Sequence, residues 1–241
     1  MAVDAYEGGL RRLEGAATVA GVLAVLDVVT EAVVEQSPCM TCVPGCSDCC
    51  HHQVLAGFGE WQHVLAYVHA HLTPDAQRAL VMRAEALLAD PRGAVAAWLK
   101  LRDKDPRTRA YLRAFNRVVE NVSTPCPFLV EGRCSIYPAR PAICRAYGRM
   151  MRTERSAYYC TRILANMQRA GPLDALELPV FQPYHRVVLR QADGSLDEVN
   201  LLPIWILAHR APDGTLRSGA QRVDPASPFP VVDGYWSYDD D

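Results

Sequence analysis

Lysine is almost missing from this chain: Lys100 and Lys104 are the only two among 25 lysine and arginine residues. The 27 acidic residues leave a formal net charge of −2, so the chain as a whole has no attraction for a polyanion such as nucleic acid. Because arginine replaces lysine throughout, part of any local arginine enrichment reflects a general preference for arginine.

Several motifs of cofactor-binding enzymes are also missing. No predicted strand is followed by a glycine-rich turn and a helix, the arrangement that holds a dinucleotide or S-adenosylmethionine in a doubly wound fold. The chain has no Walker-type phosphate loop and no Ser/His/Asp order of a hydrolase. It also has no internal repeat and no low-complexity segment. Any chemistry must therefore come from other residues.

Long hydrophobic runs are absent as well. The first apolar stretch, residues 15–26, is too short to span a bilayer. It follows an arginine pair, as the core of an export signal would, but no small-residue cleavage site comes after it. Asp27, Glu31 and Glu35 then recur at every fourth position, on one face of a helix. We therefore expect neither a signal peptide nor a membrane span.

Cysteine, by contrast, is abundant and lies in two stretches. The first holds Cys39, Cys42, Cys46, Cys49 and Cys50, and the second holds Cys126, Cys134, Cys144 and Cys160. Nine cysteines cannot all pair as disulfides, and adjacent cysteines do not easily bond to each other. A chain of 241 residues with 50% hydrophobic content can also build a core without cross-links. We interpret them as free thiols that bind a metal, and we expect a cytoplasmic, reducing location.

The spacing of the first cysteines is typical of metal-binding knuckles. Two C-x-x-C pairs occur, at positions 39 and 42 and at positions 46 and 49. Both thiolates of such a pair can point at one metal from a tight turn. Cys50 is expected to point away from Cys49. The downstream cysteines form no knuckle, so the pattern favours a folded-over cage over a zinc ribbon, either as two single-metal sites or as one cluster with accessory thiols.

Arginines surround the second cysteine stretch in the sequence. Between residues 131 and 169 the only acidic residues are Glu131 and Glu154. The arginines of this segment are Arg133, Arg140, Arg145, Arg149, Arg152, Arg155, Arg162 and Arg169. A metal or [4Fe–4S]²⁺ cluster held by four thiolates carries about two negative charges, which nearby arginines would offset. The enrichment fits an anionic site or a solvated helix face and does not identify the metal.

Hydrophobic periodicity predicts a mainly α-helical protein of the α+β class. Helices are predicted at residues 10–36, 61–72, 73–90, 105–119, 138–149 and 153–170, and a short segment without an assigned structure lies at residues 94–101. Residues 126–137 are predicted to form two short strands around a turn at Glu131 and Gly132.

The C-terminal part is richer in β-type residues. Residues 185–191 and 196–202 are predicted to form a hairpin around Asp193 and Gly194. The expected organisation is a helical domain, residues 1–170, folded around a cysteine-ligated metal centre in the motif region 39–160. A small β-containing extension, residues 171–241, is expected to pack on the same domain.

Four motifs in order carry a resemblance to a known family. They are Cys-x-x-Cys-Cys at positions 46–50, Cys-Pro-Phe-Leu from Cys126, Gly-x-Cys-x-Ile-Tyr from Gly132 and Arg-Pro-x-x-Cys-Arg from Arg140. In this combination the chain resembles the YkgJ-type cysteine-cluster family over residues 39–160. That family is described as zinc- or iron-chelating proteins with a CxxCxxCC signature, and it is related to flagellin lysine-N-methylases.

The resemblance implies a set of metal ligands. By position they are Cys46, Cys49, Cys50, Cys126, Cys134 and Cys144, with Cys160 at the place of a later cysteine that these proteins often carry. The family spacing puts one more cysteine at position 43, where this chain has Val43. Cys42 is included because Pro44 and Gly45 can absorb a shift of one residue. Cys39, His51 and His52 remain further candidates.

The all-cysteine set, the lack of paired knuckles and the methylase relatives favour an iron–sulfur cluster over zinc. The expected function is a metal-binding protein whose centre supports protein modification or redox chemistry, methylase-like if it is an enzyme. His63, Tyr67 and His71 would share one helix face as acid–base candidates, but no catalytic residue is assigned. The alternative is a zinc-stabilised module for an anionic nucleic acid or peptide. The charge argues against nucleic acid, and the protein or small-molecule partner stays open.

Overall fold

The computed structural model describes residues 2–13, 18–40, 46–101, 104–105, 108–119, 124–153, 156–157, 160–170, 178–189, 197–218 and 232–233. Most of its regular structure is helical, and the strands form one three-stranded and two two-stranded sheets within these ranges. The α+β, mainly α-helical class is therefore confirmed. No helix in the described ranges has the length and apolar character needed to cross a bilayer.

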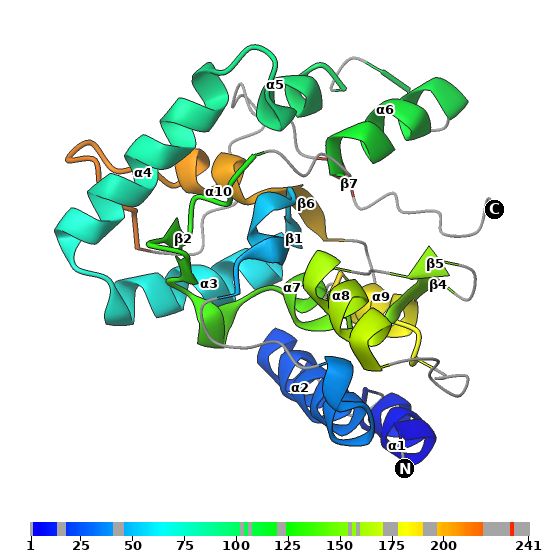
Figure 1. Cartoon of the computed structure of the whole chain (residues 1–241). Helices are drawn as coiled ribbons and strands as arrows, with labels where there is room; N and C mark the ends of the chain where they lie inside the picture. The colour runs from blue at the N-terminus through cyan, green and yellow to red at the C-terminus, as the bar shows by residue number, and fades with distance from the viewer. Residues whose placement is uncertain are drawn as a thin grey trace.

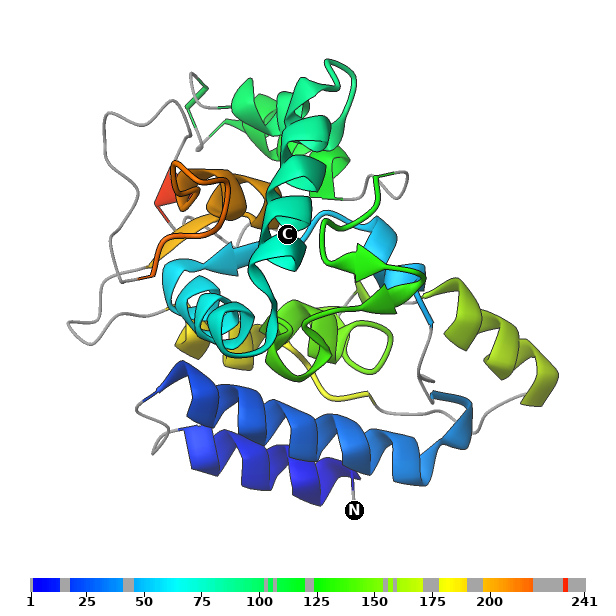
Figure 2. The ribbon, with the colours of Figure 1, turned by 90° about the vertical axis from the view of Figure 1, so that its left-hand side faces the viewer.

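The N-terminal region forms a pair of neighbouring helices, α1 (Ala2–Leu13) and α2 (Val19–Gln36), along one side of the molecule (Figure 2). Helix α2 starts where the Thr18 hydroxyl accepts a hydrogen bond from the Gly21 N–H, 3.1 Å away. It ends at Gln36, as predicted, with Ser37 as its C-cap. The single helix predicted over residues 10–36 is wrong at its start, because Thr18 is an N-cap and begins a new helix.

Four helices form the next part of the chain: α3 (Phe58–His71), α4 (Pro74–Ala89), α5 (Ala94–Leu99) and α6 (Arg109–Val119). Helices α4 to α6 lie on the side of the molecule opposite α1 and α2 (Figure 1). Thr73 caps α4 by accepting from the Ala76 N–H at 3.3 Å, and Pro74 occupies the first turn. The helices predicted at residues 61–72 and 73–90 are confirmed, whereas α6 begins at Arg109 and not at the predicted Asp105.

A small antiparallel sheet connects distant parts of the chain in the order β1 (Leu55–Gly57), β6 (Glu198–Leu201), β7 (Val232–Asp233). Leu55 pairs with Leu201. Helix α10 (Leu202–Ala208) follows β6 directly and packs against α4. Its Trp205 stacks on Trp61 with ring centroids 6.5 Å apart, and the Trp205 indole N–H donates to the Ala56 carbonyl at 2.8 Å. The largest core cluster lies around these two tryptophans.

The hairpin predicted at residues 185–202 is wrong in its first strand. Residues Gln182–Val188 form helix α9, with Pro183 in its first turn and Tyr184, His185 and Val188 buried. Short apolar runs rich in valine do not separate strand from helix, and packing against α2 and α7 decides the outcome here. Residues 190–196, including the predicted turn, lie outside the described residues.

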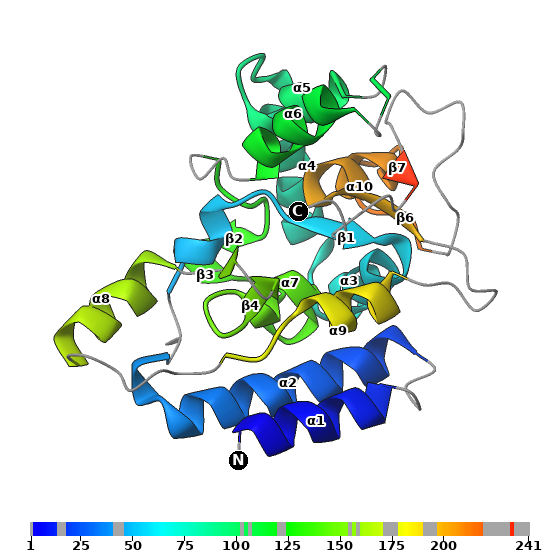
Figure 3. The ribbon, with the colours of Figure 1, turned by 90° about the vertical axis from the view of Figure 1, so that its right-hand side faces the viewer.

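The cysteine-bearing segments lie between the α1–α2 pair and the β1–β6 sheet (Figure 3). They comprise the 3₁₀ turns η1 (Pro38–Met40), η2 (Asp48–His51) and η3 (Tyr137–Ala139), the strand pairs β2–β3 (Leu129–Val130, Arg133–Cys134) and β4–β5 (Met151–Thr153, Ser156–Ala157), and helices α7 (Ala142–Ala146) and α8 (Thr161–Ala170). The helices predicted at residues 138–149 and 153–170 are thus shorter than expected.

Candidate metal centre

The two cysteine stretches meet at a backbone hydrogen bond. Cys49 and Cys50 lie in the 3₁₀ turn η2, and the Cys126 N–H donates to the Cys50 carbonyl at 2.6 Å. The expectation that Cys50 points away from Cys49 is wrong. Both side chains line the same cavity, because the tight turn of η2 brings adjacent residues together.

Cys134 is positioned by the predicted β2–β3 hairpin, which is confirmed. Glu131 and Gly132 both have positive φ, 49° and 74°, as a two-residue turn of the I′ type requires. Cys134 pairs with Leu129 across the hairpin, and the Ser135 N–H donates to the Phe128 carbonyl at 2.9 Å. The hairpin therefore holds Cys134 opposite η2.

Cys144 is carried by α7, whose first N–H is fixed by a buried carboxylate. One oxygen of Glu60 accepts from the Ala142 N–H at 2.8 Å, and the other accepts from the Gly57 N–H at 3.0 Å. Glu60 is 1% exposed, and burial raises its pKa to about 7 despite these two hydrogen bonds. It connects the start of α3 to the helix that carries Cys144.

Cys160 lies just before α8 and is joined to η2 through Asp48. The Asp48 carboxylate accepts from the Thr161 hydroxyl at 2.5 Å and from the Arg162 N–H at 2.9 Å. Gly148 makes room for this arrangement: its φ is 77°, and a Cβ there would lie 2.4 Å from Ile163 Cδ1 and 3.6 Å from Cys160 Sγ. Any other residue at this position would be strained and would clash.

These segments enclose one cavity of about 60 Å³. Its cysteine lining is Cys46, Cys49, Cys50, Cys126, Cys134, Cys144 and Cys160, and its apolar lining includes Val54, Phe128, Ile136, Ile163 and Leu202. A single buried water needs about 10–15 Å³ of such space, so the cavity has room for several atoms. Seven of the eight predicted ligands therefore lie around one space, and Cys42 lies outside the described residues.

The thiols fall into two groups by their interactions. We call Cys49, Cys50, Cys126, Cys134 and Cys144 the inner thiols and Cys46 and Cys160 the outer thiols. The inner thiols influence one another's ionisation, whereas Cys160 is influenced by Cys46 and Asp48. The charges that act on the inner thiols are thus different from the charges that act on Cys160.

Hydrogen bonds and burial separate the pKa values of the inner thiols. The Cys50 thiol donates to Cys134 and Cys49, which lowers the pKa of Cys134 to about 7 and also lowers the pKa of Cys49. The same bonds raise the pKa of Cys50. Burial raises the pKa of Cys126 to about 12 and raises that of Cys144. Cys49 and Cys134 are thus the inner thiols whose pKa values favour ionisation.

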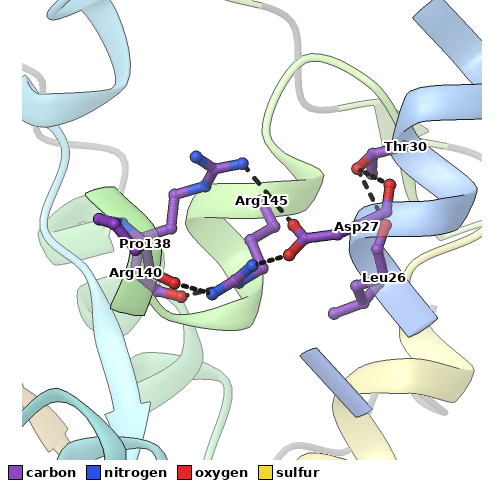
Figure 4. Close-up of polar contacts among 6 residues, drawn as sticks. All are labelled: Leu26, Asp27, Thr30, Pro138, Arg140 and Arg145. Carbon is purple, nitrogen blue, oxygen red and sulfur yellow. Dashed lines mark hydrogen bonds and ion pairs between the residues drawn. The ribbon is translucent and has the colours of Figure 1, made fainter. Parts of the chain in front are cut away.

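Four of the eight arginines of residues 131–169 line the same cavity: Arg140, Arg145, Arg149 and Arg162. Arg145 is 5% exposed and is anchored by Asp27 of α2, by the Pro138 carbonyl at 2.7 Å and by the Arg140 carbonyl at 2.9 Å (Figure 4). Arg140 also lies 3.8 Å from Asp27. From the sequence, Asp27 was expected only to lie on one face of a helix, and its ion pairs with Arg140 and Arg145 were not predicted.

Several other candidates lie away from the cavity. Cys39 packs beside Val33 and Ile163, and its carbonyl accepts from Asn166 at 3.1 Å. His51 and His52 do not line the cavity, but His52 Nε2 is hydrogen-bonded at 2.5 Å to the hydroxyl of Tyr147, which does. None of His63, Tyr67 and His71 lines it, and the rings of the last two are tilted against each other with centroids 4.3 Å apart. The structure therefore gives the acid–base hypothesis for this face no support.

The thiols line the cavity, but as a set they lie farther apart than the ligands of a metal ion do. Within the described ranges, no three or more Cys, His, Asp or Glu side chains are arranged closely enough to hold a metal ion. Thiols are nevertheless the donors that soft metals prefer, and seven of them line this space.

Comparison with known proteins gives one match. A family profile described as CxxCxxCC, putative zinc- or iron-chelating domain, matches residues 39–161, about half of the chain. No curated protein and no solved structure matches. The matched range contains every cysteine that lines the cavity. By its sequence, the chain belongs to the CxxCxxCC family of zinc- or iron-chelating domains.

Proposed function

We propose that the protein holds a metal centre through the cysteine thiolates around this cavity. The proposed ligands are drawn from Cys42, Cys46, Cys49, Cys50, Cys126, Cys134, Cys144 and Cys160. The observation that carries the proposal is the gathering of seven cysteines, from both cysteine stretches of the sequence, around one enclosed space. Membership of a zinc- or iron-chelating family supports it independently.

The ionisation of the inner thiols is consistent with metal binding. Interaction with Cys50 lowers the pKa of Cys134 to about 7 and also lowers the pKa of Cys49, so these two thiols ionise more readily than an isolated thiol. A metal cation binds deprotonated thiols and displaces their protons.

We favour an iron–sulfur cluster over zinc. The inner thiols come from a 3₁₀ turn, a hairpin with the segment before it, and a short helix, and not from two matched knuckles of the kind that hold a structural zinc ion. Four thiolates around either centre leave about two negative charges. Arg140 and Arg162 beside the cavity offset such a charge, and Val54 and Phe128 keep water away from it.

The proposed role of the centre is to support a redox or protein-modification reaction in the reducing cytosol. All described cysteines are free thiols, as metal ligation in that compartment requires. When bound, a cluster would supply electron transfer or Lewis acidity. The chain's own residues would exclude water and, through Arg145 and its Asp27 partner, fix the charges around the centre.

A different candidate function rests on α6. Its Arg109, Arg113 and Arg117 recur at every fourth position and are all exposed, which favours contact with an anionic partner. Retention on heparin that falls steeply with salt would support this binding module, and no retention at low salt would exclude it. Binding of an anionic partner by the arginine-rich segment has less support than the sequence suggested, because three of its arginine side chains, those of Arg140, Arg145 and Arg149, are largely buried.

The first test is metal and sulfide analysis with a visible spectrum on protein purified without oxygen. Iron with matching acid-labile sulfide and broad visible absorption would establish a cluster. A colourless protein with stoichiometric zinc would establish a structural or Lewis-acid site in its place. Absence of metal together with oxidised thiols would overturn the proposal.

A further inference from the structure

An open cleft lies directly beside the thiol cavity. One wall is the face of α2 that carries Asp27, Glu31 and Glu35, and the other runs from Tyr137 to Arg149. The cleft has a volume of about 500 Å³ and opens to solvent. Small-molecule sites have volumes of about 300–1,000 Å³, so this cleft has the size of a ligand site.

The cleft and the thiol cavity share one wall. Tyr137, Arg140, Arg145 and Arg149 line both spaces. Arg140 and Arg145 both form ion pairs with Asp27 (Figure 4). The Arg140 guanidinium also lies over the Tyr137 ring, 3.9 Å from its centroid. A molecule in the cleft would therefore be separated from the thiols by a single layer of side chains.

Two donors on the shared wall have no acceptor among the described residues. Arg149 is 9% exposed, and its guanidinium makes no hydrogen bond or ion pair in the described part of the chain. The Nε–H of Arg140 is also buried without a hydrogen-bond partner. A buried guanidinium without an anion is costly, and buried donors without acceptors are rare in native proteins. Both observations call for an anionic group that binds at this wall.

The opposite wall carries the complementary charge. Glu31 and Glu35 are exposed on successive turns of α2, and neither forms an ion pair within the described ranges. Carboxylates at the open side of the cleft repel a polyanion and attract a cationic group. A ligand that satisfies both walls must carry one charge of each sign.

We propose that this cleft binds a small zwitterion of the amino-acid type. Its carboxylate pairs with Arg149 and the Arg140 Nε–H, and its ammonium group lies between Glu31 and Glu35. The inference deepens the proposed function, and rests on it, because it places a substrate next to the thiol-bound centre. The competing explanation is that Arg149 neutralises the metal–thiolate charge itself.

The test is thermal stabilisation of the metal-loaded protein by each of the twenty common amino acids, with acetate and methylammonium as single-charge controls. A ligand that binds only the folded state raises the melting temperature as its concentration rises. We expect at least one amino acid to do so and both controls to fail. If no amino acid shifts the melting temperature of protein with full metal content, the cleft proposal is wrong while the metal proposal stands.

Variants on each wall of the cleft test which charged group of the ligand that wall binds. Arg149→Gln should keep its metal and bind the amino acid about ten- to a hundredfold more weakly, the loss expected for a charge-assisted hydrogen bond. The double change Glu31→Gln/Glu35→Gln on the exposed wall should also weaken binding. Arg113→Gln on α6 is the matched control and should change nothing.

Two outcomes would overturn the inference. If Arg149→Gln loses metal in proportion to its loss of binding, Arg149 serves the metal centre and not a ligand. If acetate alone stabilises the protein as well as any amino acid and the double glutamate variant binds normally, the site takes a simple anion. Metal analysis of every variant keeps these results separate from failure of the metal centre itself.

Discussion

The inner and outer thiols line the same cavity but are held in different ways. Cys134 and its inner neighbours come from a 3₁₀ turn, a hairpin and α7, which are joined by backbone hydrogen bonds and by Glu60. Cys160, an outer thiol, depends on one carboxylate, Asp48, to connect α8 with η2. The inner group is thus built on a rigid frame, whereas the outer pair lies at its edge.

This difference separates ligands from accessory thiols. Five inner thiols already exceed the four that a tetrahedral ion or a cubane cluster needs. Cys46 and Cys160 would then adjust the environment of the centre or bind it weakly. If this division is correct, substitutions of inner thiols should lower metal content and stability more than substitutions of outer thiols do.

The largest effect is expected for Cys134→Ser. Serine removes a soft thiolate at the position where Cys50 donates its hydrogen bond, so most of the metal should be lost. Because a metal bound only in the folded state contributes folding free energy, we expect a loss of several kcal/mol and a melting temperature lower by roughly 10 °C. Metal analysis and thermal unfolding measure both. Full metal content with an unchanged melting temperature would show that Cys134 is not a ligand.

A smaller effect is expected for Cys160→Ser. The serine hydroxyl can still accept from the Ile163 N–H, which is 3.3 Å from the sulfur atom in the present structure. We expect metal retention against a competing chelator to fall about tenfold, or about 1.4 kcal/mol. Cys39→Ser, outside the cavity, is the matched control and should behave as wild type. A loss for Cys160→Ser as large as that for Cys134→Ser would remove the distinction between the groups.

Asp27→Asn tests the ion pair that holds Arg145 beside the inner thiols, and it leaves every cysteine in place. It leaves the buried Arg145 without its anionic partner, although two carbonyls still accept from it. Because Asp27 is itself 38% exposed, we expect only about 1 kcal/mol of lost stability in denaturant unfolding. Glu31→Gln, on the same face but without an ion pair in the described structure, is the control. Equal stability of the two variants would contradict this role of Asp27.

Local signals in the sequence predicted local structure well. Thr73 and Pro74 marked the start of α4, and Glu131 and Gly132 marked the hairpin turn, because each feature depends on neighbours along the chain. Residues 185–188 were assigned wrongly because a valine-rich run suits either a strand or a buried helix, and contacts with α2 decide which forms.

The site was predictable in its cysteines but not in the residues that support them. Cys126 and Cys144 could be named because the motif spacing resembles that of a known family. Glu60 contacts α7 across 82 residues, and Arg145 contacts Asp27 across 118. Such pairings depend on the tertiary fold, and no periodicity or motif in a single sequence specifies them.

The smallest predicted effect concerns Glu60 and the pH dependence of stability. Burial raises its pKa to about 7 from the ordinary 4.5, so the folded protein holds this proton where the unfolded chain has released it. The resulting stabilisation is complete below pH 4.5 and is lost as the pH rises through 7. Between pH 6 and 7 we expect the free energy of unfolding to fall by at most about 1 kcal/mol on this account. Glu60→Gln should abolish that slope. The variant should also be less stable than wild type at low pH, because the glutamine amide nitrogen cannot accept a hydrogen bond from the Gly57 or Ala142 N–H.

Urea unfolding of the wild type and of Glu60→Gln at several pH values measures the slope. An identical slope in the variant would mean that Glu60 stays ionised throughout, held by its two N–H donors, and that the frame of the inner thiols does not respond to pH through this residue.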